Sequence, residues 1–383
     1  MSIVMILLLA ASLSHLITRW LVKASRRWGV LDVPNWRSFH TRPMPRLGGV
    51  GICTSFALTL LPLWLMFSGE FEALSLRVAL VGYVVVAGVG LADDLRAVSP
   101  LTKFIGQLGA SVITVWGGVL WLGLTLPYGV RLSFGLFSIV LTVLWLTGVT
   151  SIFNFMDGID GLAGGVGVIY SSALACVCFG TGHRLVGVVS LILAVACLGF
   201  LAHNFSPAKI FMGDVGSLFV GYALAATAVV VTNSGAEPAP FMAVVLIFGT
   251  FLYDGTLTIL RRLLRGERVY EAHRSHLYQR LVLAGQSHRR VSLTYYGLSA
   301  LLAAGGVGYT FAPDWLRLMI LTWSAVVLLY FTGYVNRVEA RKQGGEVPTQ
   351  YSGPRNQDNK SGHVKVGSGP LCVNDIPQPS KPN

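Results

Sequence analysis

Charged side chains are scarce in this chain of 383 residues: they make up 12% of it, whereas hydrophobic residues make up 53%. An ordinary soluble domain carries about 25% charged residues. Apolar runs of about 20 residues recur along most of the length, and each is long enough to cross a bilayer. The composition excludes an ordinary soluble protein and predicts an all-α, polytopic membrane protein.

Cysteine is also rare, and its spacing excludes a zinc or redox motif. Four of the five cysteines lie in apolar runs, where cysteine behaves as a small core hydrophobe. The five are Cys53, Cys176, Cys178, Cys197 and Cys372.

The apolar runs predict about eleven transmembrane helices. No basic residue precedes His15 in the first run, which favours a retained helix over a signal peptide. The predicted ranges are about 1–17, 48–68, 76–92, 102–122, 132–150, 163–180, 184–203, 217–233, 239–260, 291–311 and 315–336. From about residue 340 the chain turns polar, so we expect a membrane domain over 1–336 and a disordered tail over 337–383.

The basic residues are unevenly distributed between the predicted loops. Of 29 Lys and Arg residues, 25 fall in segments 18–47, 93–103, 204–216, 261–292 and 337–383. By the positive-inside rule these segments, including the tail, are cytoplasmic and the N-terminus is outside. The net charge of +12 therefore reflects topology, and we expect no nucleic-acid partner.

Polar and acidic residues gather at the predicted cytoplasmic helix ends. Carboxylates that cluster repel one another unless a cation or proton lies among them, and oxygen ligands suit Mg²⁺ or Mn²⁺ with a phosphate substrate. Each residue alone could be a helix cap at a solvated turn, but together they predict one composite site at the cytoplasmic face. The residues are Asp93, Asp94, Asn154, Asp157, Asp160, Asn204, Asp214, His273 and His276.

Two glycine-rich segments hold the strongest candidates. In SIFNFMDGIDGLAGG (151–165), Asp157 and Asp160 are three apart, so on a helix they would share a face. In NFSPAKIFMGDVGS (204–217), Asp214 lies on a turn that opens a helix, where amides could hold a phosphate oxygen. Phe211 would be an exposed aromatic that stacks on a base, or else an interfacial belt residue.

Basic side chains offer weaker signals. Lys103 begins a helix on the same side and is as readily a positive-inside anchor as a phosphate contact. His273, His276 and Arg280 have the spacing of one helical face, which suits an anion-binding surface or a helix lying on lipid headgroups.

Four segments together resemble the polyprenyl-phosphate N-acetylhexosamine-1-phosphate transferases, which include the phospho-N-acetylmuramoyl-pentapeptide translocase and enzymes that begin O-antigen. They are PRLGG (45–49), ADDL (92–95), NFMDGIDGLAGG (154–165) and NFSPAKIFMGDVGS (204–217). The resemblance implies a bundle of ten or eleven helices in a bacterial inner membrane, with a cytoplasmic-facing active-site cleft. It also implies transfer of N-acetylhexosamine 1-phosphate from a UDP-sugar to undecaprenyl phosphate, with release of UMP.

The resemblance also implies roles for single residues. Asp214 would bind Mg²⁺, with Asn154 as a further ligand, while Asp93 and Asp94, with Lys103, would serve the lipid phosphate and the chemistry. The nucleotide-sugar would be held by Asp157, Asp160, Asn204, Phe211 (against uracil) and His276.

The last motif departs from the family. The family often has an acid followed by HLHH, whereas residues 273–279 read HRSHLYQ and keep only His276 of that set. This form resembles the branch that uses N-acetylfucosamine, N-acetylquinovosamine or similar deoxy sugars, and the muramoyl-pentapeptide substrate fits less well.

Three alternatives stay open at this level. A multi-pass glycosyltransferase would release UDP in place of UMP. A secondary transporter would place its acids near the membrane midplane between inverted repeats, and no convincing repeat is present. If the protein is such a transferase, direct attack by the lipid phosphate is favoured over a two-step mechanism in which Asp93 or Asp94 is phosphorylated first. A homodimer is one oligomeric state that the sequence leaves open.

Overall fold

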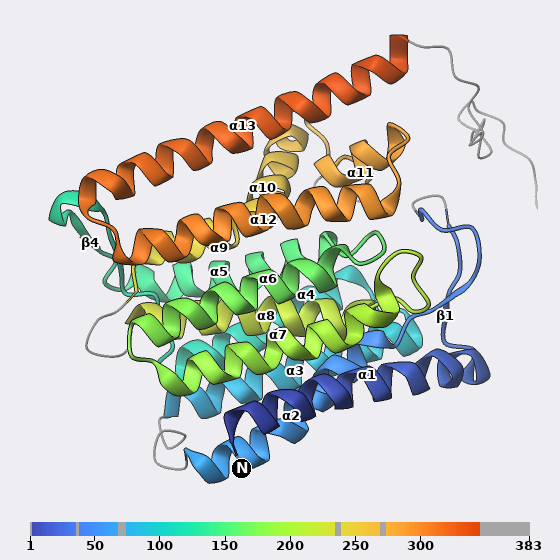
Figure 1. Cartoon of the computed structure of the whole chain (residues 1–383), viewed down its shortest axis with the longest axis horizontal. Helices are drawn as coiled ribbons and strands as arrows, with labels where there is room; N and C mark the ends of the chain where they lie inside the picture. The colour runs from blue at the N-terminus through green and yellow to red at the C-terminus, as the bar shows by residue number, and fades with distance from the viewer. Residues whose placement is uncertain (1, 36–37, 68–73, 234–238, 269–272, 345–383) are drawn as a thin grey trace, which may run out of the picture. The chain divides into compact units, whose positions relative to one another are not determined.

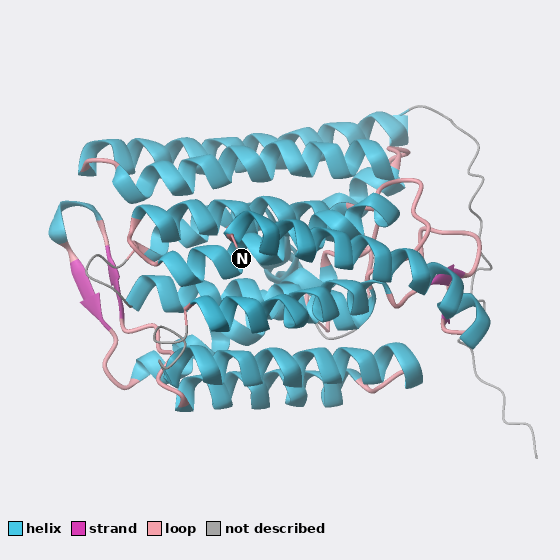
Figure 2. Cartoon of the chain, turned by 60° about the horizontal axis from the view of Figure 1, so that its bottom comes forward, coloured by secondary structure: helices cyan, strands magenta, loops and turns pink. Residues whose placement is uncertain are grey.

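In the computed structural model, residues 2–35, 38–67, 74–233, 239–268 and 273–344 are described, and most of them are helical (Figures 1 and 2). Of the tail predicted over 337–383, residues 337–344 belong to the last helix, and residues 345–383 lie outside the described residues. The helices are α1 (Ile3–Trp28), α2 (Gly48–Met66), α3 (Leu74–Arg96), α4 (Pro100–Trp116), α5 (Phe137–Phe155), α6 (Leu162–Gly180), α7 (Arg184–Asn204), α8 (Gly213–Asn233), α9 (Phe241–Ile247), α10 (Gly249–Leu264), α11 (Leu277–Leu283), α12 (His288–Phe311) and α13 (Asp314–Gly344).

Two short antiparallel hairpins and one turn of 3-10 helix complete the described secondary structure. The strands are β1 (Leu31–Asp32) with β2 (Met44–Pro45), and β3 (Gly123–Thr125) with β4 (Arg131–Ser133); the 3-10 turn is η2 (Pro127–Gly129). The two hairpins lie at opposite ends of the bundle in Figure 2.

The polytopic all-α prediction is confirmed. Among the described residues, eight helices are long and apolar enough to span a membrane, or nine if the bent pair α9–α10 counts as one span. The shorter α4 and the helix α3 are not among these, so the number eleven stays a prediction. The chain is a multi-pass membrane protein.

Helix α8 forms the centre of the bundle, with 89% of its most apolar window buried. It is apolar on all sides, as a helix surrounded by other helices requires. Glycines bring neighbouring backbones close: a side chain at Gly221 would collide with Phe153 of α5, and one at Gly82 of α3 with Tyr222. The Tyr222 hydroxyl donates to the Ala110 carbonyl of α4 (2.9 Å).

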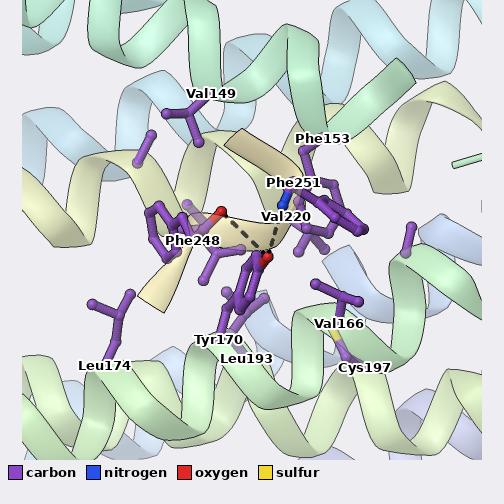
Figure 3. Close-up of a cluster of buried hydrophobic side chains, with 14 of the residues drawn as sticks. Val149, Phe153, Val166, Tyr170, Leu174, Leu193, Cys197, Val220, Phe248 and Phe251 are labelled. Carbon is purple, nitrogen blue, oxygen red and sulfur yellow. Dashed lines mark hydrogen bonds between the residues drawn. The ribbon is translucent and has the colours of Figure 1, made fainter. Parts of the chain in front are cut away.

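The helix predicted over 239–260 is divided in the structure, because α9 and α10 meet at an angle of 80°. The Tyr170 hydroxyl of α6 occupies the break, where it donates to the Phe248 carbonyl (3.3 Å) and accepts from the Phe251 amide (3.1 Å) (Figure 3). The hydroxyl thus gives the Phe251 amide a partner at the bend, while the Phe248 carbonyl also accepts from the Leu252 amide (3.0 Å). Other bounds also shift: the run predicted as 1–17 continues to Trp28, and the last helix continues to Gly344.

The alternation of up and down helices brings many termini to one end of the bundle. Side-chain hydrogen bonds join the helix ends that meet there. They are the C-terminal ends of α3, α5 and α7 and the N-terminal ends of α4, α6, α8 and α12.

Candidate functional site at one end of the bundle

Three predicted acidic residues come together where α3 ends and α8 begins. Carboxylate oxygens of Asp93, Asp94 and Asp214 lie within 4.8 Å of one another. Gly213 permits this approach: its φ of +72° is left-handed, and a side chain there would collide with the Asp94 carboxylate. Residues 120 positions apart in the chain thereby form one cluster.

Asp93 and Asp94 make different contacts although they are adjacent. Both oxygens of Asp94 accept amide hydrogen bonds from the first turn of α8, from Asp214 and from Val215 (3.0 Å each). Asp93 accepts from the Val98 amide through one oxygen (2.8 Å) and turns its other oxygen toward nearby cations. Asp94 therefore fastens α8 in place, as a carboxylate at a helix N-terminus does.

Two cations lie between these carboxylates. Lys103 Nζ is 2.8 Å from an oxygen of Asp214 and 3.3 Å from one of Asp93, which places this predicted residue inside the cluster. Arg46 Nη2 is 2.7 Å from Asp94 Oδ1 and 3.5 Å from Asp93 Oδ2. Three carboxylates thus face two cations, and the excess negative charge suits a divalent cation.

Sequence reasoning missed Arg46, because PRLGG (45–49) was used only as one of four segments that resemble the family and its arginine was given no role. The available signal was an arginine two residues before a Gly-Gly pair. The amides of Gly48 and Gly49 donate to the carbonyls of Phe211 and Met212 (3.0 and 2.7 Å), and this backbone pairing places Arg46 beside the cluster. Burial lowers the pKa of Arg46, but the charge and hydrogen bond of Asp94 outweigh it and raise that pKa overall.

Asn154 lies in the last turn of α5 beside the start of α8. Its Nδ2 donates to Ser217 Oγ (2.7 Å), and Ser217 is three residues beyond Asp214. The contact places Asn154 close to the acidic cluster, and its role as a metal ligand stays a prediction.

Asp157 and Asp160 do not share a helical face, since both lie in the non-helical turn between α5 and α6, as the predicted helices 132–150 and 163–180 allow. Asp160 joins this turn to two others: its carboxylate accepts from the Ala208 amide (3.2 Å) and lies 3.3 Å from His288 Nδ1 at the start of α12. Burial alone would raise the pKa of Asp160, but the hydrogen bond and charge of His288 lower it below its ordinary value.

The pKa of Asp157 is shifted in the opposite direction to that of Asp160. Burial raises its pKa to about 8, and the negative charges of Asp214 and Asp94 act in the same direction. Asp157 is therefore within electrostatic reach of the acidic cluster.

Asn204 uses its side-chain amide to join two loops. Its Oδ1 accepts from the Gly161 amide (3.0 Å) and its Nδ2 donates to the Ile210 carbonyl (2.9 Å). These contacts make it a loop-positioning residue in the structure, and its contact with a sugar stays a prediction.

The expectation that Phe211 is freely exposed needs correction. The side chain is half-buried, and its ring lies edge-on to that of His40 with centroids 5.0 Å apart. Its amide donates to the Pro45 carbonyl (2.8 Å). Stacking of Phe211 on uracil stays a prediction.

The helical face predicted for His273, His276 and Arg280 is also wrong, because α11 begins only at Leu277. His276 is buried, and its ring lies 6.4 Å from that of Phe155, next to Asn154 in sequence. His276 Nδ1 is 3.2 Å from Asp254 Oδ1 on α10. Asp254 was given no role from sequence, although an ionisable residue inside an apolar run is a signal in itself.

His273 is the second histidine of this loop, with its ring centroid 4.9 Å from that of His276. Burial, followed by the nearby charges of His276 and Arg262, lowers the pKa of His273 to about 4. His273 is therefore neutral near pH 7.

Apolar helices whose ends bring acids, amides and cations together define an integral membrane protein with a polar site at one end of its bundle. Residues 76–232 match the family described as glycosyl transferase family 4. The chain is 32% identical over 312 residues to a probable undecaprenyl-phosphate N-acetylglucosaminyl 1-phosphate transferase of Bacillus subtilis, covering 80% of this chain and 86% of that protein.

Two other relatives are also more than 30% identical to this chain. A decaprenyl-phosphate N-acetylglucosaminephosphotransferase of Mycobacterium tuberculosis is 34% identical, over 79% of this chain and 81% of its own. A phospho-N-acetylmuramoyl-pentapeptide-transferase of Halalkalibacterium halodurans is 31% identical, over 68% of this chain and 81% of its own. The chain belongs to glycosyl transferase family 4, and the resemblance drawn from its four motifs is confirmed.

Proposed function

We propose that this protein transfers N-acetylhexosamine 1-phosphate from a UDP-sugar to undecaprenyl phosphate and releases UMP. The reaction takes place at the cytoplasmic face of a bacterial inner membrane and begins a lipid-linked glycan such as O-antigen. The observation that carries the proposal is the cluster of Asp93, Asp94 and Asp214 with Lys103 and Arg46, which suits two phosphates and a divalent cation.

The sugar is the finer part of the proposal. Two relatives are named for N-acetylglucosamine, which favours UDP-N-acetylglucosamine as the first substrate to assay. The HRSHLYQ form of residues 273–279 keeps UDP-N-acetylfucosamine and UDP-N-acetylquinovosamine in the panel.

The donor set fits Mg²⁺, with Mn²⁺ as an alternative, because every candidate ligand is a hard oxygen. Asp214 and Asp93 would hold the ion, with Asn154 as a further ligand, whereas both oxygens of Asp94 already accept hydrogen bonds from α8. When bound, the ion neutralises diphosphate charge and stabilises the leaving group.

In the proposed reaction, an oxygen of the lipid phosphate forms a bond to the sugar-bearing phosphorus, and the bond from that phosphorus to the UMP oxygen breaks. The second pKa of a phosphate monoester is about 6, so at pH 7 the nucleophile is mostly a dianion and proton removal by Asp93 adds little. Lys103 and Arg46 instead offset negative charge where two anions must meet. Positioning and charge neutralisation supply most of the acceleration.

The contacts of the two adjacent acids favour a single step. Asp94 is held through both oxygens by amides of α8. Asp93 is held through one oxygen by the Val98 amide and ion-paired through the other with Lys103 and Arg46, so neither acid presents an unpaired oxygen as a nucleophile. Incubation with UDP-sugar labelled in the β-phosphate, without lipid, is expected to leave the protein unlabelled. A trapped phospho-aspartate would overturn the single-step reaction.

The function is tested with purified protein, undecaprenyl phosphate, Mg²⁺ and the panel of UDP-N-acetylhexosamines, by following lipid product and released nucleotide. One sugar is expected to give lipid diphosphate sugar and UMP in equal amounts. Asp214→Asn is expected to lower kcat by at least about a hundredfold with every sugar, because it removes charge at the reacting phosphates. Release of UDP, or activity retained in this variant, would contradict the proposal.

A further inference from the structure

Asp254 is an acidic residue buried within α10, with 1% of its surface exposed. Its carboxylate accepts hydrogen bonds from the backbone amides of Leu277 (2.8 Å) and Tyr278 (3.2 Å). The hydroxyls of Tyr295 (2.5 Å) and Thr258 (3.2 Å) donate to the same group. Four donors around two oxygens suit an ionised carboxylate, which only accepts hydrogen bonds.

The same carboxylate orients His276. Oδ1 of Asp254 lies 3.2 Å from His276 Nδ1, and because a carboxylate accepts, Nδ1 must carry the proton of this contact. In the neutral imidazole, the other ring nitrogen, Nε2, then carries no proton and can accept a hydrogen bond. A carboxylate partner is the usual means by which proteins select one histidine tautomer.

The turn that Asp254 holds is also docked on the turn that carries Asp157. The Tyr278 hydroxyl donates to the Phe155 carbonyl (3.0 Å), and a side chain at Gly158 would collide with that hydroxyl. The Gln279 side chain donates to the same hydroxyl (3.1 Å). A shift of the Asp254 carboxylate would therefore disturb both turns.

We infer that Asp254 is a positioning residue, which fixes the tautomer and orientation of His276 for recognition of the nucleotide-sugar. With 1% of its surface exposed, Asp254 would act through His276 and not by contact with a substrate. The inference rests on the proposed function for its link to the sugar, whereas the hold of Asp254 on the imidazole is independent of that function.

The hold on the imidazole is tested by nitrogen-15 NMR of the histidine side chains, with His276→Gln to assign the signals. The wild-type protein is expected to show His276 protonated at Nδ1. Asp254→Asn presents either an oxygen or an NH₂ group to the ring, so it is expected to add signals of the Nε2-protonated form. A folded Asp254→Asn protein with only the wild-type signals would overturn the inference.

The link to the sugar is tested by kinetics. Asp254→Asn is expected to raise KM for the UDP-sugar about tenfold, as loss of an orienting partner does, and to change KM for undecaprenyl phosphate less than twofold. Thr258→Val, which removes one donor to the carboxylate without touching His276, is the matched control and stays near wild type. Equal changes in both KM values would mean a structural role and overturn the inference.

A second variant guards against misfolding. Asp254→Glu keeps the charge but moves the carboxylate by one methylene, and it is expected to raise the same KM. If the wild-type protein transfers no sugar phosphate at all, the proposed function fails, while the NMR result still decides whether Asp254 orients His276.

Discussion

Two adjacent aspartates at the end of α3 carry out different tasks. Sequence reasoning joined Asp93 and Asp94 in one role, although adjacent side chains on a helix diverge by about 100°. The structure separates them: Asp94 holds the first amides of α8, and Asp93 faces Lys103.

The difference predicts unequal stability losses. Asp94→Asn places an NH₂ group against a backbone N–H and leaves a buried donor unpaired, so we expect it to cost about 1–3 kcal/mol of unfolding free energy. Asp93→Asn keeps an oxygen for the Val98 amide and costs less. Denaturant unfolding in detergent measures both. Equal losses would contradict the division of roles.

Asp160 predicts a dependence of stability on pH. Its folded-state pKa is lowered, chiefly by His288 after the opposing effect of burial, so its contribution is present above its ordinary pKa of 3.8 and is lost as the pH falls through the folded-state value. Thermal unfolding of wild type and Asp160→Asn should therefore differ at pH 6 and converge as the pH falls below about 4. A difference that persists at the lowest pH would argue against the ion pair with His288.

Asp157 should behave in the opposite way in metal-free protein. Its pKa is raised to about 8, mainly by burial, so the folded state binds the proton more tightly and loses stability as the pH rises from about 4 to 8. Asp157→Asn should remove that loss, and unfolding temperatures at pH 5 and 8 compare the two proteins. A wild-type protein no less stable at pH 8 than at pH 5 would contradict the raised pKa.

At the scale of elements, the helices could be predicted because each is a continuous apolar run, and their ranges agree to within a few residues for most. The break between α9 and α10 could not, since Phe248 and Gly249 continue the apolar pattern and the hydroxyl that bonds the Phe251 amide at the break comes from Tyr170, 81 residues earlier. The place of Arg46 could not be predicted either, because only the pairing of residues 48–49 with 211–212, far away in the sequence, brings it to the acids.

Loss of the Tyr170 hydroxyl tests that account of the break. Tyr170→Phe leaves the Phe251 amide without its partner in a buried, apolar cluster, whereas the Phe248 carbonyl keeps the Leu252 amide (Figure 3). We expect a cost of about 1–3 kcal/mol of unfolding free energy. Tyr309→Phe is the matched control, because the buried Tyr309 hydroxyl has no hydrogen-bond partner among the described residues. Equal effects of the two substitutions would show that Tyr170 does not support the break.

For the whole molecule, one end of the bundle holds the candidate site and the other the β3–β4 hairpin. The basic loops predict that the first end faces the cytoplasm, and the structure supplies marker positions on both. Arg289 of α12 is exposed one residue from His288, which contacts Asp160, and Ser133 is exposed on β4.

These positions decide the orientation by cysteine labelling. In a variant whose five native cysteines are replaced by alanine, Ser133→Cys should react with a membrane-impermeant maleimide on intact bacterial cells. Arg289→Cys should react only after the membrane is opened, because 25 of the 29 basic residues lie on its side of the predicted topology. The reverse pattern would place the acids on the side where no UDP-sugar is available, and the proposed transfer would then lack its donor.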